Sequence, residues 1–441
     1  MTPTPELPAP ADPFHRIRTN YLVGLSVWSF GFGIISLASF LIVYDKTKSV
    51  SATGLVIVCL SVPQLLLPAV ATKLCRSWGA PTLYVVGNAL CCIIGLLPVA
   101  LSLLGLLSVP ALLAWYVLLG IVFGICTPSS GILRVMLAAP GKLPEFDGAA
   151  TMAWAAASVI GYLVGAGAYA ALGATWVYLI GAMAYLPLTL AVVPLIKRAP
   201  AVAVNASEHF RDVLSVWHND GGIRATTIFT LLCFTVGGYT VVLPALASTL
   251  GTNPGILAIL EAASVFGGLF ASVIIKRVQG RFGWDSAVRF ASIMIAISLG
   301  VLAVMAFHDG PSSFISASNA WISMFVITGV IIGASLGLDF QSSILNAVVQ
   351  NAAPTKERDA VLTGYALVPL LAVPIGQEAI GLIADNVSLA AGIGVTALCL
   401  LAFVLISPHT DLHKEFDVLH DAVITPGHGA SQAATTGRHV Q

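Results

Sequence analysis

The segment ITGVIIGASLGLDFQSSILNAVVQ (residues 327–350) is one copy of a pattern that occurs twice in the chain. Its glycines, Gly329 and Gly333, have the same spacing as Gly120 and Gly124, about 210 residues earlier. Both copies are otherwise strongly apolar. Glycines four residues apart lie on one face of a helix, where they allow close packing against a neighbour. The pattern therefore predicts two equivalent helices in two related halves.

The two copies are followed by related short motifs but differ in charge. DGAAT (147–151) follows the first copy, and DAVLT (359–363) follows the second. Two acidic residues, Asp339 and Glu378, lie within apolar segments of the second copy, and the first copy has no counterparts. We infer that the chain contains two copies of one helical unit, and that only the second copy has acidic side chains in its apolar segments.

The composition excludes a soluble fold. Hydrophobic residues make up 57% of the 441 residues, charged residues only 9%, and the mean hydropathy is +0.93. So few charged side chains could not cover the surface of a soluble protein of this length. The formal net charge of zero carries no information about partners, because the bilayer and not a charged partner dominates the energetics; no nucleic-acid partner is expected.

Apolar runs of about 20 residues, each long enough to cross the hydrocarbon core as a helix, recur along the chain. We predict an all-α polytopic membrane protein with twelve spans, near 20–44, 52–72, 82–107, 111–137, 149–171, 174–196, 224–249, 254–276, 286–307, 320–347, 361–384 and 387–407. Pro63 and Pro68 predict a kink in the second span.

The basic residues predict the orientation. Placing the N-terminus in the cytoplasm puts 18 of the 20 Lys and Arg residues at or near the cytoplasmic face, and leaves only Lys46 and Lys48 outside. Positively charged short loops stay cytoplasmic. We therefore expect a multi-pass protein of a bacterial inner (plasma) membrane with both termini inside. The first apolar run is long enough to remain as a span, so no cleavable signal is expected.

Segments outside the spans complete the predicted organisation. They are a disordered head at 1–17, a linker at 198–223 that contains a surface helix, and a cytoplasmic tail at 408–441, and they flank six-helix halves at 18–197 and 224–407. The tail contains His409, His413, Asp417 and His420 at helical spacing. Because they match no metal-binding motif, a solvated helix is preferred and no metal site is predicted.

The six-plus-six layout, the basic glycine-containing loops after the second and eighth spans and the long inner connection resemble the major facilitator superfamily (MFS) of secondary transporters. Within it, residues 116–173 are similar to the fourth and fifth spans of bacterial exporters of siderophores and macrolides. Two motifs depart from that family. Thr72 and Lys73 replace the expected Asp and Arg of the inner loop, and Gly161-Tyr162 replaces the Gly-Pro of the antiporter motif in the fifth span.

Acidic side chains inside hydrocarbon are the proton-coupling candidates, since they are costly there and mark functional sites. Glu378 lies near the middle of the eleventh span, and its role is either to carry a proton or to form a structural hydrogen bond. Asp339 lies in the inner half of the tenth span and either faces the cavity or forms hydrogen bonds at an inner gate. Glu261, in the outer half of the eighth span, is a third candidate, which a structural role as a buried neutral residue would also explain.

Arg134 ends a polar stripe on the fourth span. We expect it either to reach Asp339 across the pseudo-twofold axis when the transporter opens outward, or to extend to the lipid headgroups. The resemblance implies that the first, fourth, seventh and tenth spans line a central cavity. The substrate-cavity candidates combine aromatic and polar side chains, for which ordinary packing remains the alternative: Trp28, Phe32, Trp154, Tyr162, Thr235, Tyr239, Gln341, Ser342 and Ser343.

Several functions fit this pattern. The first is proton-coupled export of a bulky amphipathic small molecule, such as a drug, siderophore or other secondary metabolite. Movement of a lipid or lysolipid is the second, a receptor or assembly factor with a transporter fold is the third, and import remains open. No Walker loop, zinc pattern or nucleophile elbow occurs, so no enzyme and no cofactor are predicted. The family expectation is a monomer.

Overall fold

The computed structural model describes residues 14–139, 142–196, 221–251, 253–279, 284–307, 320–352, 365 and 367–406. These ranges are almost entirely helical and contain no strand. Residues 1–13 of the predicted head, the surface helix of the linker and the tail with its histidines lie outside the described residues. The all-α class predicted from the composition is confirmed.

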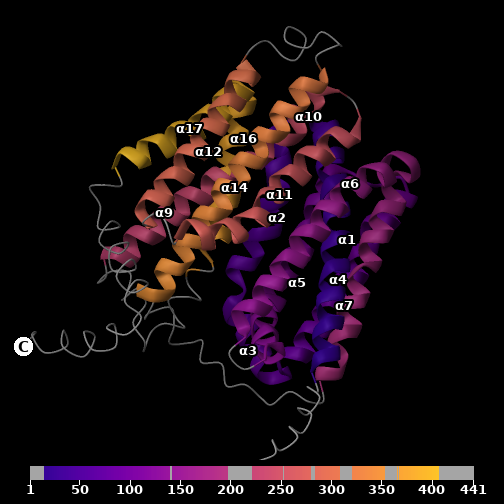
Figure 1. Ribbon diagram of the computed structural model, residues 1–441. Helices are drawn as coiled ribbons and strands as arrows, with labels where there is room; N and C mark the ends of the chain where they lie inside the picture. The colour runs from indigo at the N-terminus through magenta and orange to yellow at the C-terminus, as the bar shows by residue number, and fades with distance from the viewer. Residues whose placement is uncertain are drawn as a thin grey trace, which may run out of the picture.

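The helices fall into two consecutive sets. The first set, which we call the N-half, consists of α1 (His15–Thr47), α2 (Val50–Leu66), α3 (Pro68–Trp78), α4 (Ala80–Leu103), α5 (Val109–Leu137), α6 (Leu143–Met183), α7 (Tyr185–Val192) and the 3-10 turn η1 (Val193–Leu195). The second set, the C-half, consists of α9 (Gly221–Gly237), the 3-10 turn η2 (Gly238–Val242), α10 (Leu243–Leu250), α11 (Pro254–Gln279), α12 (Trp284–Phe307), α14 (Ala320–Ala352), α16 (Val368–Asn386) and α17 (Leu389–Ile406). Figure 1 shows α4 to α7 on one side of the molecule, α12, α14 and α17 on the other, and α2 and α11 between them.

The twelve predicted spans correspond to these helices. Within the described ranges, eight apolar helical segments are long enough to cross a membrane, and α2 with α3 forms a ninth, bent by 64°. One of the eight, Glu145–Leu195, contains two predicted spans. The chain changes direction between them at Gly173, whose φ of 78° is not helical. Two shorter apolar helices, Pro254–Phe270 and Leu389–Ala402, supply the remaining two.

Local chemistry explains several of the helix boundaries. Ser49 and Ser108 cap α2 and α5, since each side chain accepts a hydrogen bond from the backbone N–H three residues later. Pro68 lacks an N–H and therefore starts α3 instead of extending α2, which gives the kink expected from the prolines in this span.

Close contact between α1 and α6 depends on small residues. A methyl group at Gly161 of α6 would overlap the backbone carbonyl of Phe30, and one at Gly31 of α1 would overlap the side chain of Ala184. The hydroxyl of Ser29 lies 2.7 Å from that of Ser158 and donates to the carbonyl of Trp154 at 2.8 Å. The glycines of the altered antiporter motif thus serve helix packing in this structure.

Among the described residues, the two halves share buried apolar contacts at one end only. One core cluster joins Leu37, Val50 and Ala166 of the N-half to η2, α10, α11 and α14 of the C-half. The clusters at the opposite end each belong to a single half, one around Tyr21 and Leu133 and another around Phe229 and Ile344. The predicted orientation makes the joined end the outer end, which would correspond to an inward-facing conformation; the orientation and this assignment stay predictions, and 'inner' and 'outer' are used below in that sense.

Candidate functional site

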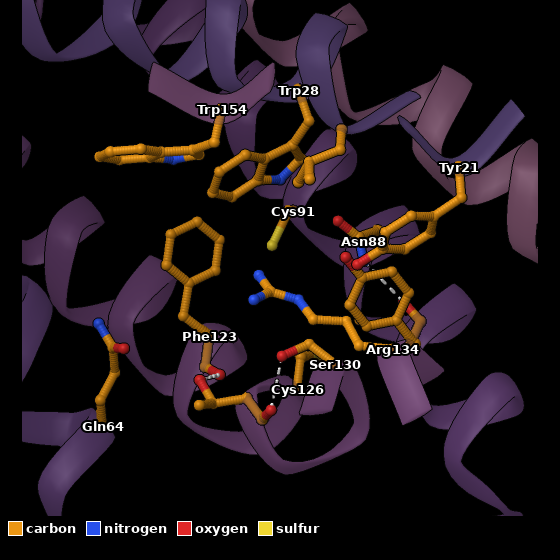
Figure 2. A pocket seen from close by; sticks show the side chains of 14 residues that line it. Tyr21, Trp28, Gln64, Asn88, Cys91, Phe123, Cys126, Ser130, Arg134 and Trp154 are labelled. Atoms are coloured by element: carbon orange, nitrogen blue, oxygen red, sulfur yellow. Dashed lines mark hydrogen bonds between the residues drawn. The ribbon is translucent and has the colours of Figure 1, made fainter. Parts of the chain in front are cut away.

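A cavity of about 250 Å³ opens in the inner part of the N-half. Residues from α1, α2, α4, α5 and α6 line it (Figure 2): Tyr21, Leu25, Trp28, Gln64, Tyr84, Gly87, Asn88, Cys91, Phe123, Cys126, Thr127, Ser130, Arg134 and Trp154. Three of these had been selected from the sequence, namely Trp28, Trp154 and Arg134. The volume lies somewhat below the range of about 300–1,000 Å³ that holds drug-sized ligands.

Aromatic rings form one wall of the cavity. Trp28 stacks on Phe32 of the next helical turn, with ring centroids 5.6 Å apart and planes inclined by 5°. Phe123 of α5 packs against both, at 5.8 Å from Trp28 and 6.1 Å from Phe32. Trp154 of α6 is 39% exposed. Phe32 therefore supports the wall from behind, while Trp28, Phe123 and Trp154 face the space.

Arg134 is the single charged residue among those that line the cavity. Figure 2 shows its guanidinium directed into the space below Trp28. Its Nη1 atom lies 3.7 Å from Oδ1 of Asp147 on α6, a distance that allows attraction but exceeds a hydrogen bond. Its Nε atom is buried without a hydrogen-bond partner. In this conformation Arg134 is thus paired within the N-half, and its contact with Asp339 in the outward-facing form stays a prediction.

Several polar side chains that line the cavity donate hydrogen bonds to backbone carbonyls of their own helices. The hydroxyls of Thr127 and Ser130 donate to backbone carbonyls one turn earlier on α5, each at 2.8 Å. The amide nitrogen of Asn88 donates to the carbonyl of Tyr84 at 2.9 Å. Asn88, Tyr84 and Phe123 were not selected from the sequence. Asn88 is the only Asn, Asp, Glu, Lys or Arg in the predicted span 82–107, and that isolated polar residue was the available signal.

The C-half candidates on α14 lie close to one another. The Asp339 carboxyl lies over Gly268 of α11, where an added methyl group would meet it. The hydroxyls of Ser342 and Ser343 both donate to the backbone carbonyl of Asp339, at 3.2 and 2.8 Å. Gln341 is fully buried and donates to the hydroxyl of Ser292 on α12 at 2.7 Å. In this conformation Gln341 therefore contacts a neighbouring helix.

Glu261 is the most deeply buried of the three acids. It is 4% exposed on α11, among residues of the cluster that joins the halves. Two other candidates, Tyr162 of the N-half and Tyr239 of the C-half, lie within electrostatic range of Glu261. The Tyr239 hydroxyl is buried without a hydrogen-bond partner. Glu261 thus lies where the halves meet.

Glu378 lies near the middle of α16 and contacts the start of α2 in the N-half. Its Oε1 accepts a hydrogen bond of 2.7 Å from the hydroxyl of Ser51 on α2, and its Oε2 is buried without a partner. The sequence could not show this contact, because the two residues are 327 positions apart. Thr235 of α9 lies at a close approach of α9 and α16, where its backbone would meet a methyl group at Gly376.

A second carboxylate next to Glu378 also binds α2. Asp385 accepts hydrogen bonds from the Ser49 hydroxyl at 2.6 Å and from the backbone N–H groups of Val50 and Ser51 at 2.8 and 3.0 Å. A carboxylate at a helix N-terminus satisfies otherwise unpaired N–H groups and complements the helix dipole. We call the contacts of Asp385 and Glu378 with residues 49–51 the outer latch.

Residues 21–376 match the sequence profile described as Major Facilitator Superfamily. The chain belongs to this family. No curated protein matches the sequence. The superfamily predicted from the duplicated halves is confirmed, and with it a multi-pass secondary transporter, while the siderophore and macrolide exporter subgroup stays a prediction.

Solved structures of other MFS transporters share the fold at low identity. The nucleoside transporter NupG has a TM-score of 0.66 at 11% identity, covering 91% of this chain and 98% of NupG. A D-xylose-proton symporter has a TM-score of 0.66 at 14% identity, with coverages of 88% and 96%. A bacterial homologue of the iron transporter ferroportin, in an inward-facing state, has a TM-score of 0.63 at 18% identity, with coverages of 88% and 98%.

Proposed function

We propose that this MFS protein is a proton-coupled secondary transporter that exports a bulky amphipathic small molecule by alternating access. In this proposal the protein works as a monomer in the inner (plasma) membrane with both termini in the cytoplasm. The observation that carries it is the N-half cavity, which combines aromatic surface with polar groups and one arginine. It lies at the end where the described parts of the two halves share no core cluster. Apolar walls with a few polar groups are typical of small-molecule sites.

The coupling is assigned to the carboxyl groups of Glu378, Asp339 and Glu261. Glu261 and Glu378 lie at contacts between the halves, which must separate when the outer end opens. A proton and a substrate can drive a conformational change only if each binds the two conformations differently. Carboxyls whose surroundings change between the conformations meet that condition.

The proposal is tested with the purified full chain in liposomes that contain a pH-sensitive dye, at equal pH on both sides. Siderophores, hydrophobic drugs and lysolipids are added outside one at a time. A proton antiporter makes the lumen alkaline when a compound enters, whereas a symporter makes it acidic. We expect alkalinisation with a drug or siderophore in the parent, and its loss in Glu378→Gln and Asp339→Asn.

Glu145→Gln serves as the control, since Glu145 is exposed at the start of α6 and lies outside these contacts. Full activity in both Glu378→Gln and Asp339→Asn would refute coupling through these groups. Acidification would show import by symport. Flux with lysolipids alone would identify a lipid transporter, and no flux with any compound would refute the proposed transport activity.

A further inference from the structure

We propose that the N-half cavity binds a monoanionic aromatic carboxylate, with the carboxylate on Arg134 and the ring against Trp28, Phe123 and Trp154. This inference deepens the proposed function, on which it rests, because it names the chemical class of the cargo. A cavity of this size holds either a small aromatic acid or the aryl-carboxylate part of a larger amphipathic molecule.

Arg134 provides a cationic donor that the protein itself leaves incompletely bonded. Its Nε atom is buried without an acceptor, and its nearest carboxylate oxygen, on Asp147, is 3.7 Å from Nη1. A ligand acceptor in the cavity would therefore meet the terminal Nη groups and not the buried Nε atom, and hydrogen bonds to charged groups are among the stronger ones. The guanidinium fork matches the two oxygens of a carboxylate. Its position in Figure 2, directed into the cavity, leaves that fork available to a ligand.

The charged groups at the cavity favour a ligand with a single negative charge over a dianion or a cation. No acidic residue is among those that line the cavity, and Arg134 is their one cation. Asp147 already offsets part of the positive charge from the side of α6, since its side chain faces Arg134 across 3.7 Å. A dianion such as a phosphate monoester would carry more charge than these groups balance, and a cationic ligand would be repelled by Arg134.

The aromatic side chains of the cavity favour a ligand with a flat ring. The rings of Trp28 and Phe123 are half-buried and held by mutual contacts at 5.8 Å, so they keep their positions without a ligand. Trp154, on α6, is more exposed than these two. Flat aromatic ligands pack on such rings by offset stacking or edge contact. An aliphatic chain would make less favourable packing contacts with these rings than an aromatic ligand.

Binding of 2-naphthoate to the full chain in lipid nanodiscs, measured by calorimetry with empty nanodiscs as background, tests the inference. The neutral 2-naphthamide and the cationic 2-naphthylmethylamine have the same ring system. We expect 2-naphthoate to bind at least about tenfold more tightly than either, as a charge-assisted pair supplies. Arg134→Gln should remove that preference, and Arg134→Lys should keep only part of it. Arg16→Gln, an exposed arginine at the start of α1, should change nothing.

Asp147→Asn gives a result of opposite sign. Because Asp147 competes for the charge of Arg134, its neutralisation should tighten 2-naphthoate binding several-fold and leave 2-naphthamide unchanged. If the pair of Arg134 and Asp147 had a purely structural role, Asp147→Asn would weaken the binding of both ligands. This variant decides the question even if Arg134→Gln fails to fold. Tighter binding of the amide or amine in the parent, or weaker naphthoate binding in Asp147→Asn, would overturn the inference.

The inference and the proposed function fail in different experiments. Proton-coupled flux of neutral or cationic amphiphiles without naphthoate binding would refute the cargo class and leave the transport function standing. Naphthoate binding that depends on Arg134, in a protein that moves no compound across liposomes, would support the site and refute the transport function.

Discussion

Glu261 is an acidic side chain that is 4% exposed on α11, within electrostatic range of Tyr162 of one half and Tyr239 of the other. A charged carboxylate in such surroundings is costly unless it is paired. Glu261→Gln keeps the shape and removes the charge. We therefore expect an unchanged or higher unfolding temperature, together with at least about a tenfold loss of pH-driven transport, if proton transfer here is as important as general acid–base steps usually are.

The measurements for Glu261 are thermal unfolding in detergent and the liposome dye assay. Glu145→Gln is again the matched control, as an exposed acid outside the interface. Parent-like transport by Glu261→Gln would assign this residue a structural role. A large fall in unfolding temperature would instead show that the ionised form makes contacts on which the fold depends.

At the scale of single residues, sequence reasoning found the acids and placed Glu378 ahead of Glu261, but it could not identify their neighbours. Asp339, Glu378 and Glu261 stand out because carboxyl groups are rare in apolar spans. Their roles depend on neighbours that are remote in the sequence, such as Ser51 for Glu378. Asp385 was missed because it lies just beyond the predicted eleventh span, where an acid is ordinary. Its importance follows only from its contact with the start of α2.

At the scale of single helices, the packing of α1 on α6 makes a prediction about two glycines. A methyl group at Gly161 would overlap the Phe30 carbonyl, whereas one at Gly167 of the same helix meets open space. Gly161→Ala should lower the free energy of unfolding by about 1–3 kcal/mol through overpacking. Gly167→Ala should be neutral, or stabilising by about 0.5–1 kcal/mol, because Ala restricts the unfolded chain. Thermal unfolding of both variants measures the difference, and equal shifts would contradict this account of the contact.

The sequence predicted the helices well, because hydropathy and length together define a span. It also predicted the kink of the second span from its prolines, although the 64° bend depends on how α3 packs after the break. The break at Gly173 was predicted only as a short connection between the fifth and sixth spans, with no feature that specified a left-handed residue. The contribution of α4 to the cavity could not be foreseen, since a helix face becomes a cavity wall only through tertiary packing.

At the scale of the whole molecule, the outer latch favours the conformation in which the outer ends of α2 and α16 meet. Asp385→Ala removes three acceptor contacts and a helix cap, and a lost cap costs about 0.5–2 kcal/mol. We expect this variant to shift the population toward the outward-facing form by a factor of about 2–30. Asp385→Asn keeps an acceptor oxygen and should therefore shift the population toward the outward-facing form less than Asp385→Ala does.

Two spin-label distances test alternating access between the halves most directly, in the parent and in Asp385→Ala, with labels on introduced cysteines after the native cysteines are replaced. One pair joins Val135 of α5 to Asn346 of α14 at the inner ends, and the other joins Leu104 after α4 to Thr249 of α10 at the outer ends, all at exposed positions. The account predicts that Asp385→Ala lengthens the outer distance and shortens the inner one in the same fraction of molecules. An outer distance that lengthens while the inner one stays fixed, or two distances that do not change, would contradict it.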